Sequence, residues 1–348
     1  MKAARLHSIG DFSCDNIEIP SPKGEELLIK VGACGICGSD YPRVFEHGSS
    51  NGKYPLTIGH EFSGEIVEVG EKADKGLIGQ KGAIFPIIPC MECEPCRVSR
   101  YAMCESYDYL GSRRDGGMAQ YCLIPSKWNF IKSNGASMMS LAMTEPACVA
   151  QHAIRKGNVC AGQTVIIFGA GPIGIMAARW VELFGARPIL ADINKEKINF
   201  VKKLGYDIIY SNTTDLVDSV RKLNKGKLAD VAIEGTGSGS ALINCIECVR
   251  PCGYISLLGN PNADISIPSK IHSTIMRKEL TISGVWNSSQ CTYPVSEWEY
   301  TVNMMDLGKF VVDDLITDKL QLEDIPNIMR QIKDGKHNSI KAMFVNDF

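Results

Sequence analysis

The chain has 348 residues, of which 45% are hydrophobic and 22% charged, and its formal net charge is −2. This near-neutral balance excludes the basic surface that nucleic-acid binding needs, and no run of about 18 apolar residues indicates a membrane span. The N-terminus lacks the apolar core of a signal peptide. Fourteen cysteines without such a signal indicate a cytoplasmic protein, in which clustered thiols bind metals more often than they form disulfides.

Residues 1–150 predict an irregular β domain. Short apolar runs at 26–37, 61–70, 81–89 and 116–125 are interrupted by glycine and proline. Parallel strands need connections of about a dozen residues or more, and these runs leave no room for them.

Residues 151–286 predict a doubly wound parallel sheet. The run TVIIFG is a buried strand and PIGIMAARWVELFG a helix; RPILADI and KEKINFVKKLG repeat the pair. Apolar strands that alternate with helical patterns indicate βαβ units. After Trp286 the sequence predicts helices at 295–308 and 324–336 and a final strand at 339–345.

The first strand–helix junction carries a glycine motif. Gly169, Gly171 and Gly174 have G-x-G-x-x-G spacing, and Asp192 ends the next strand. In this context the glycines allow a tight turn and close approach of a pyrophosphate, while the acid binds a ribose 2′-hydroxyl. A carboxylate repels a 2′-phosphate, so the sequence predicts NAD rather than NADP. The alternative is a glycine turn in a purely structural βαβ unit.

Four cysteines lie within one polar stretch with C-x2-C-x2-C-x7-C spacing: Cys90, Cys93, Cys96 and Cys104. Four soft thiolates in one loop predict a closed, structural zinc site, which leaves no position open for substrate. An iron–sulfur cluster is the rival, but the fourth cysteine lacks the ferredoxin spacing and its following proline.

A second group of possible ligands is dispersed through the first domain. Cys37, His60, Glu61 and Glu145 offer sulfur, nitrogen and oxygen donors of the kind found in catalytic zinc sites. A buried lone cysteine and a surface His–Glu pair remain equally good interpretations, and a Cys34–Cys37 redox pair lacks a thioredoxin-like context.

The segments CGICGSD, GHEFSGEIVEVG, the four-cysteine stretch, EPACVAQHA and VIIFGAGPIG, in this order, resemble the zinc-dependent medium-chain alcohol and polyol dehydrogenases. The resemblance covers essentially the whole chain. It implies a GroES-like catalytic domain at 1–150, completed by 287–348, and a Rossmann NAD-binding domain at 151–286. It also implies two zinc ions per chain and a homodimer or homotetramer.

The resemblance assigns roles to residues of the dispersed group. It implies that Cys37, His60 and Glu145 hold the catalytic zinc, that Glu145 binds directly or through water, and that Glu61 can exchange onto the metal. Ser39 matches the hydroxyl that accepts the substrate proton, with a turn-stabilising hydroxyl as the alternative. Pro42 stands where relatives continue the proton relay, so the outer relay has no candidate other than water.

The segments CGSDYPRVFEHG, YDYLGSRRDGGMAQY and GVWNSS resemble the branch of the family that oxidises sugar-alcohol phosphates. Arginine guanidinium groups bind phosphate well, and the candidate substrate residues are Arg43, Arg113, Arg114 and Asn287, with Lys53 as a further cation. The alternatives are a dehydrogenase for free sorbitol, xylitol, butanediol or threonine on the same scaffold, and a non-catalytic nucleotide-binding redox sensor.

Overall fold

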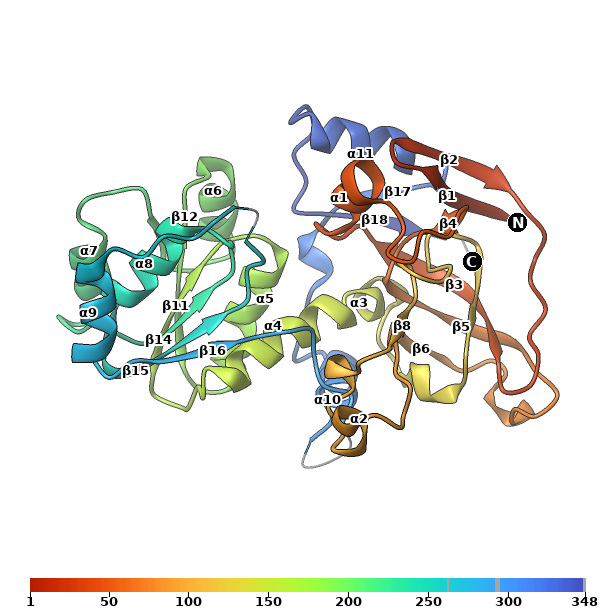
Figure 1. Ribbon diagram of the computed structural model, residues 1–348, viewed down its shortest axis with the longest axis horizontal. Helices are drawn as coiled ribbons and strands as arrows, with labels where there is room; N and C mark the ends of the chain where they lie inside the picture. The colour runs from red at the N-terminus through yellow and green to blue at the C-terminus, as the bar shows by residue number, and fades with distance from the viewer. Residues whose placement is uncertain (262, 292–294, 347–348) are drawn as a thin grey trace. The chain divides into compact units, whose positions relative to one another are not determined.

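The computed structural model describes residues 1–261, 263–291 and 295–346. The chain forms two compact units (Figure 1). The first consists of Met1–Pro146 and Ser289–Phe348, and the second of Ala147–Ser288. Within the described residues no helix has the length and apolarity needed to cross a membrane.

The first unit is built on a mainly antiparallel seven-stranded sheet. Its path is β10 (Phe130–Lys132), β6 (Lys81–Ile84), β5 (Glu61–Val69), β3 (Leu27–Gly35), β18 (Lys341–Val345) and β17 (Ile316–Leu320), and β9 (Tyr121–Ile124) also pairs with β3. A smaller sheet has the order β2 (Asp11–Asn16), β1 (Lys2–Ser8) and β4 (Leu56–Thr57). The apolar run of β3 is buried along almost its whole length, so this strand forms the centre of the unit.

The C-terminal strand is part of this first sheet. Strand β18 pairs antiparallel with β3, with Met343 opposite Gly35 and Val345 opposite Ala33. The chain therefore returns to the first unit after the second, and the start of β18 lies beside the turn that follows β3.

The four-cysteine stretch lies between the two strands of a small antiparallel sheet. Strands β7 (Ile87–Ile88) and β8 (Asp108–Tyr109) pair antiparallel, with Ile87 opposite Tyr109. The chain between them forms only the short helices α2 (Glu94–Arg97) and η3 (Tyr101–Met103). We call residues 89–107 the cysteine lobe.

Short helices complete the first unit. They are α1 (Asp40–Pro42), η1 (Arg43–His47), η2 (Lys75–Leu77), η4 (Lys127–Asn129), α3 (Met138–Ala142), α10 (Glu297–Asp306), η5 (Asp313–Leu315) and α11 (Ile325–Lys333). The carboxylate of Asp306 at the end of α10 accepts the backbone amides of Asn134, Gly135 and Ala136 and the hydroxyl of Ser133. One side chain thus satisfies the polar groups of a whole turn.

The second unit is a six-stranded parallel sheet in the order β13 (Ile208–Tyr210), β12 (Arg187–Asp192), β11 (Thr164–Phe168), β14 (Ala229–Glu234), β15 (Val249–Leu257) and β16 (Thr281–Gly284). Helices α5 (Pro172–Leu183) and α6 (Lys195–Lys203) lie on one side of the sheet; α7 (Leu216–Leu223), α8 (Gly239–Cys248) and α9 (Ser269–Arg277) lie on the other (Figure 1). Helix α4 (Thr144–Lys156) begins in the first unit and ends in the second.

The strand order 3-2-1-4-5-6 is that of a dinucleotide-binding Rossmann fold, with the switch point between β11 and β14. Strands β11 and β12 are buried almost throughout, which explains their unbroken apolar sequences. The expected α/β plus β class is confirmed.

Candidate active site

Three of the dispersed ligand candidates meet at the end of β3. Cys37 lies in the turn after β3, His60 directly precedes β5, and Glu61 is the first residue of β5. Glu61 stands opposite Gly35 in the β3–β5 ladder. One ligand atom from each of Cys37, His60 and Glu61 lies within 4.8 Å of the others.

Asp40 connects two members of this group. Its Oδ2 accepts a hydrogen bond from the Cys37 amide at 2.9 Å, and its Oδ1 lies 3.5 Å from Nδ1 of His60. Burial alone would raise the pKa of this carboxyl, but His60 and the Cys37 amide outweigh it, so the pKa of Asp40 lies below its ordinary value. Asp40 therefore remains a carboxylate that faces Nδ1 of His60, which leaves Nε2 for a metal.

Glu145 lies next to the group but outside it. It is the second residue of α4, is 7% exposed, and its Oε1 accepts a hydrogen bond from the Tyr109 hydroxyl at 3.4 Å. Burial raises the pKa of Glu145 to about 7, with His60 and Glu61 as charged neighbours. Cys37, His60 and Glu61 are therefore close enough together to bind one metal ion, and Glu145 is their neighbour.

Lys341 is a residue of this site that the sequence interpretation missed. It lies on β18, and its Nζ donates hydrogen bonds to Oε2 of Glu61 and, at 2.9 Å, to the carbonyl of Ile36. Gly35 leaves room for this pair, because a Cβ at that position would lie 2.5 Å from Oε2 of Glu61. A lone lysine in the apolar strand sequence KAMFV was the available signal.

Ser39 follows Cys37 by two residues in the chain, in the turn between β3 and α1. It is the N-cap residue of α1, its side chain is exposed, and in the described structure its hydroxyl makes no capping hydrogen bond to the helix. The hydroxyl is thus not used to stabilise the turn. Pro42 ends α1 and has neither a side-chain donor nor an acceptor for a proton relay.

The residues of this site fit a zinc ion. A thiol, an imidazole and a carboxylate form the sulfur, nitrogen and oxygen donor set that zinc prefers. Burial alone would lower the pKa of His60, but Tyr109, Asp40 and Cys37 together raise it well above its ordinary value. This concentration of acidic groups is what a divalent cation neutralises. Nδ1 of His60 and Oδ1 of Asp40 have no hydrogen-bond partner among the described residues.

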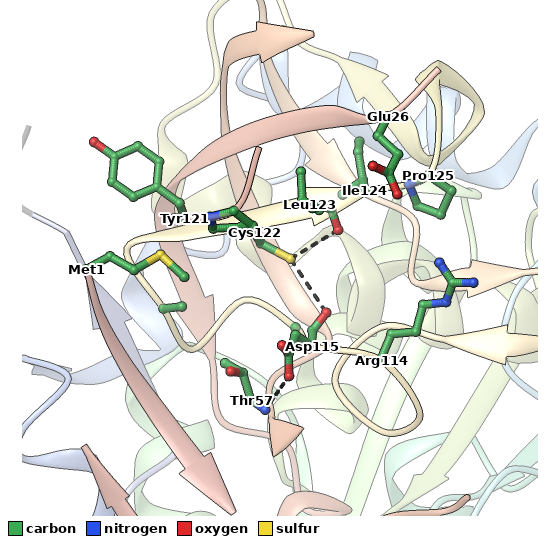
Figure 2. A pocket seen from close by; sticks show the side chains of 13 residues that line it. Met1, Glu26, Thr57, Arg114, Asp115, Tyr121, Cys122, Leu123, Ile124 and Pro125 are labelled. Atoms are coloured by element: carbon green, nitrogen blue, oxygen red, sulfur yellow. Dashed lines mark hydrogen bonds between the residues drawn. The ribbon is translucent and has the colours of Figure 1, made fainter. Parts of the chain in front are cut away.

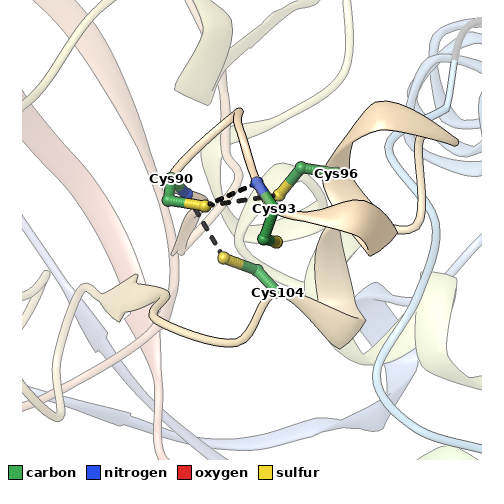
Figure 3. A group of neighbouring side chains, drawn as sticks. All are labelled: Cys90, Cys93, Cys96 and Cys104. Atoms are coloured by element: carbon green, nitrogen blue, oxygen red, sulfur yellow. Dashed lines mark hydrogen bonds between the residues drawn. The ribbon is translucent and has the colours of Figure 1, made fainter.

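The four cysteines of the cysteine lobe form a second cluster (Figure 3). Their sulfur atoms lie within 4.8 Å of one another, and the Cys90 and Cys96 sulfurs are 4.0 Å apart. Tetrahedral zinc with bonds of about 2.3 Å places sulfurs about 3.8 Å apart, so the fit is close. Hydrogen bonds from the amides of Glu92 and Cys93 lower the pKa of Cys90 to about 6, which favours the thiolate.

The glycine motif of the second unit has the geometry of a phosphate-binding turn. Gly169 has a φ of +102°, and a Cβ on Gly174 would lie 1.9 Å from the carbonyl oxygen of Gly169. At Gly171, the N-cap of α5, a Cβ would meet nothing within 4 Å. The turn thus leaves open space in front of the free amides of a 12-residue helix.

A cavity of about 440 Å³ adjoins this turn, with Gly169, Asp192, Asn212, Thr236 and Ser238 among its lining residues. The Asp192 carboxylate accepts the amides of Ala170 at 2.7 Å and Asn194 at 2.8 Å. The acid is therefore held rigidly at the end of β12, where a nucleotide ribose binds in this fold.

The candidate phosphate ligands have different surroundings. Arg113 donates to the carbonyl of Tyr107 and lies 4.2 Å above the Tyr107 ring, and Arg114 pairs with Asp108. Arg43 donates from Nη1 to Ser50 at 2.8 Å, but its buried Nε has no partner among the described residues. Lys53 is exposed, and Asn287 belongs to the second unit, with a φ of +54°.

Figure 2 shows a smaller cavity of about 210 Å³ in the first unit, lined by Arg114 and Cys122 among others. The Cys122 thiol donates to the carbonyls of Asp115 and Leu123, and burial raises its pKa. Cys122 therefore remains a protonated thiol, as expected for a small buried side chain rather than a metal ligand.

Comparison with known proteins decides the family. Residues 23–134 match the model of the alcohol dehydrogenase GroES-like domain, and residues 172–306 match that of the zinc-binding dehydrogenases. The galactitol 1-phosphate 5-dehydrogenase of Escherichia coli K12 is 32% identical over 88% of this chain and 89% of its own length. The chain belongs to the zinc-type medium-chain dehydrogenases. The family resemblance and its GroES-like and Rossmann domains are confirmed.

Two other findings place the chain among these medium-chain dehydrogenases. The crystal structure of galactitol-1-phosphate dehydrogenase from Escherichia coli superimposes with a TM-score of 0.91 at 30% identity, covering 99% of this chain and 100% of that one. The D-xylulose reductase A of Aspergillus oryzae is 32% identical over 95% of this chain and 93% of its own length. The family is therefore one of zinc-dependent oxidoreductases, and its members differ in substrate.

Proposed function

We propose that this protein is an NAD-dependent zinc dehydrogenase that oxidises a secondary hydroxyl of a sugar-alcohol phosphate, galactitol 1-phosphate, to the ketose phosphate, tagatose 6-phosphate. The observation that carries the dehydrogenase activity is the Cys37–His60–Glu61 group at the end of β3, with Glu145 beside it. The four cysteines of the cysteine lobe are proposed to hold a second, structural zinc.

Within this proposal the catalytic zinc is held by Cys37, His60 and Glu145, and Glu61 is the neighbouring acid that can exchange onto it. A bound zinc ion lowers the pKa of the substrate hydroxyl, and a bound NAD supplies the hydride acceptor. The Asp40 carboxylate, 3.5 Å from Nδ1 of His60, is proposed to stabilise the imidazole when its Nε2 binds the metal. Lys341 holds the Glu61 carboxylate and balances its charge.

The proton of the substrate hydroxyl passes to Oγ of Ser39 and from there to water. Ser39 is suited to this because its exposed side chain is not engaged in capping α1. The overall reaction is balanced: the alcohol loses a hydride to NAD and a proton to solvent, and a carbonyl group forms. Water remains the outer relay, because Pro42 has no transferable proton.

The proposed cofactor is NAD because of Asp192. The carboxylate is fixed by two backbone amides at the edge of the 440 Å³ cavity, where it cannot turn away from a 2′-phosphate. Gly169, Gly171 and Gly174 are proposed to bind the pyrophosphate.

The proposed phosphate ligand is Arg43. It follows Ser39 by four residues in the chain, where α1 ends and the π-helix η1 begins. Its Nε has no partner among the described residues, whereas Arg113 and Arg114 already bind Tyr107 and Asp108. We therefore rank Arg43 before Arg113, Arg114, Lys53 and Asn287.

A second candidate substrate class is that of free polyols such as xylitol, because the D-xylulose reductase is as similar in sequence as the galactitol 1-phosphate 5-dehydrogenase, 32% identical in both cases. An NADH-forming assay with galactitol 1-phosphate, galactitol, sorbitol and xylitol separates the two. We expect the highest kcat/KM for galactitol 1-phosphate, and a loss of that preference in Arg43→Ala. Higher kcat/KM for a free polyol would overturn the phosphate assignment, and one zinc per chain without turnover would favour a redox sensor.

We also propose a cytoplasmic homodimer or homotetramer. The four cysteines of the cysteine lobe form no disulfide with one another, as in a reducing compartment. Strand β16 is an edge strand with Ile282 37% exposed, and Trp286 just beyond it is 56% exposed. An unprotected sheet edge with apolar side chains favours pairing with a second copy. Light scattering of the purified protein tests this, and a monomer at micromolar concentration would contradict it.

A further inference from the structure

Tyr109 contacts two of the proposed zinc ligands. Its hydroxyl donates to Oε1 of Glu145 at 3.4 Å, and its ring meets the His60 imidazole edge-on, with centroids 5.8 Å apart at 61°. Glu145 belongs to α4 and His60 to the segment before β5, so Tyr109 joins ligands from two separate elements.

The backbone of Tyr109 is held on both sides. As a residue of β8 it stands opposite Ile87, and the next amide, that of Leu110, donates to the carbonyl of Pro86 at 3.0 Å. The carbonyl of Tyr109 accepts the amides of Arg113 at 3.0 Å and Arg114 at 3.1 Å. The ring therefore projects from a fixed point.

The side chains around Tyr109 reinforce this position. The Tyr107 ring packs edge-on against it with centroids 6.3 Å apart, and the Arg113 guanidinium covers the Tyr107 ring. Arg113 and Arg114, whose sequence suggested phosphate binding, therefore contact the two residues immediately before Tyr109.

Strand β8, which carries Tyr109, also directly follows the cysteine lobe in the chain. The chain enters the lobe from β7 two residues before Cys90 and returns to β8 four residues after Cys104. The β7–β8 ladder is thus shared by the four-cysteine cluster at one end and by Tyr109 at the other.

From these contacts we propose that Tyr109 is a positioning residue for the catalytic metal: it orients the Glu145 carboxylate and the His60 ring and connects them to the cysteine lobe. This inference rests on the proposed zinc-dependent function. A hydrogen bond to one oxygen of a carboxylate ligand fixes its orientation, and removing such a partner commonly weakens metal binding 10- to 100-fold, roughly.

The test compares zinc binding by Tyr109→Phe, Tyr107→Phe and the parent protein in the full chain. Tyr109→Phe keeps the ring and removes only the hydroxyl that reaches Glu145; Tyr107→Phe is the matched control on the same segment. Chelator competition with metal analysis gives the affinity of each zinc, and cobalt substitution gives a spectrum of the catalytic ligand field.

We expect Tyr109→Phe to bind the catalytic zinc at least about 10-fold less tightly than the parent does. The spectrum of the cobalt-substituted variant should also differ from that of the parent, and kcat should fall with little change in KM. The affinity for the zinc of the cysteine lobe and the melting midpoint should stay close to those of the parent. Tyr107→Phe should match the parent throughout.

Two results would contradict these expectations, and they are distinguishable. If the parent binds two zinc ions and Tyr109→Phe matches it in affinity and spectrum, Tyr109 has no positioning role, while the proposed function stands. If the parent binds only the zinc of the cysteine lobe, the proposed function itself fails.

Discussion

Lys341 forms an ion pair with Glu61 in which both side chains are almost completely buried, 4% and 2% exposed. The lysine comes from the last strand of the chain and the acid from β5, 280 residues earlier. Burial lowers the pKa of a lysine, but Glu61 and the neighbouring acids outweigh it, so the pKa of Lys341 is raised and the ammonium persists. This pair ties the C-terminal segment to the proposed metal site.

Replacing Lys341 by methionine leaves Glu61 buried without a counter-charge, which costs about 3–5 kcal/mol. We expect the melting midpoint of Lys341→Met to fall by several degrees, and the double variant with Glu61→Gln to recover part of the loss. Lys319→Met, an exposed lysine on the adjacent strand β17, is the control. An unchanged midpoint for Lys341→Met in calorimetry would show that the pair does not stabilise the unit.

Cys37→Ser removes one thiolate from the proposed catalytic site. Metal analysis should then show about one zinc per chain instead of about two, with turnover lost and the melting midpoint and NAD binding nearly unchanged, because an open site contributes little to the fold. Retention of both zinc ions and of activity would exclude Cys37 as a ligand.

Cys93→Ser is the matched change in the cysteine lobe. It should also reduce zinc to about one per chain, but here the melting midpoint should fall first, since a structural zinc contributes directly to folding energy. Activity should decline only as the lobe loosens and Tyr109 loses its position. A stable Cys93→Ser protein with full zinc content would contradict a structural site.

Asp192→Ala should weaken NAD binding and relax the discrimination against NADP. Loss of the hydrogen bond to ribose raises the Kd for NAD, and loss of the negative charge removes the repulsion of a 2′-phosphate. Fluorescence titration with NADH and NADPH measures both effects. Asp215→Ala, an exposed acid in the same unit, is the control. An unchanged ratio of the two Kd values would remove Asp192 from cofactor selection.

Asp306 should make stability depend on pH. Burial would raise the pKa of this carboxyl, but hydrogen bonds from Ser133 and the amides of Asn134–Ala136 hold it below its ordinary value. A lowered pKa in the folded state means that the stabilisation is complete above the unfolded pKa, near 4, and is lost as pH falls through the folded pKa. Asp306→Asn should therefore lower the melting midpoint at pH 7 and matter progressively less below pH 4, roughly. Glu18→Gln, an exposed acid, should show no such trend.

The sequence by itself determined the fold class and the local motifs. The alternation of apolar strands and helices predicted the parallel sheet because βαβ units bury their strands on both faces. The glycine spacing and the four cysteines could be interpreted because each forms its geometry within one short segment, so neighbours in sequence are also neighbours in space.

Only the tertiary structure decided which distant residues meet. Lys341 and Tyr109 escaped the sequence interpretation because their roles depend on the pairing of β18 with β3 and of β8 with β7, and no local pattern encodes those pairings. Arg113 and Arg114 differ in that their partners, Tyr107 and Asp108, are only six residues earlier in the chain and are reached through the turn after β8. The site's contacts join segments up to 305 residues apart, and their geometry exists only once the sheet has formed.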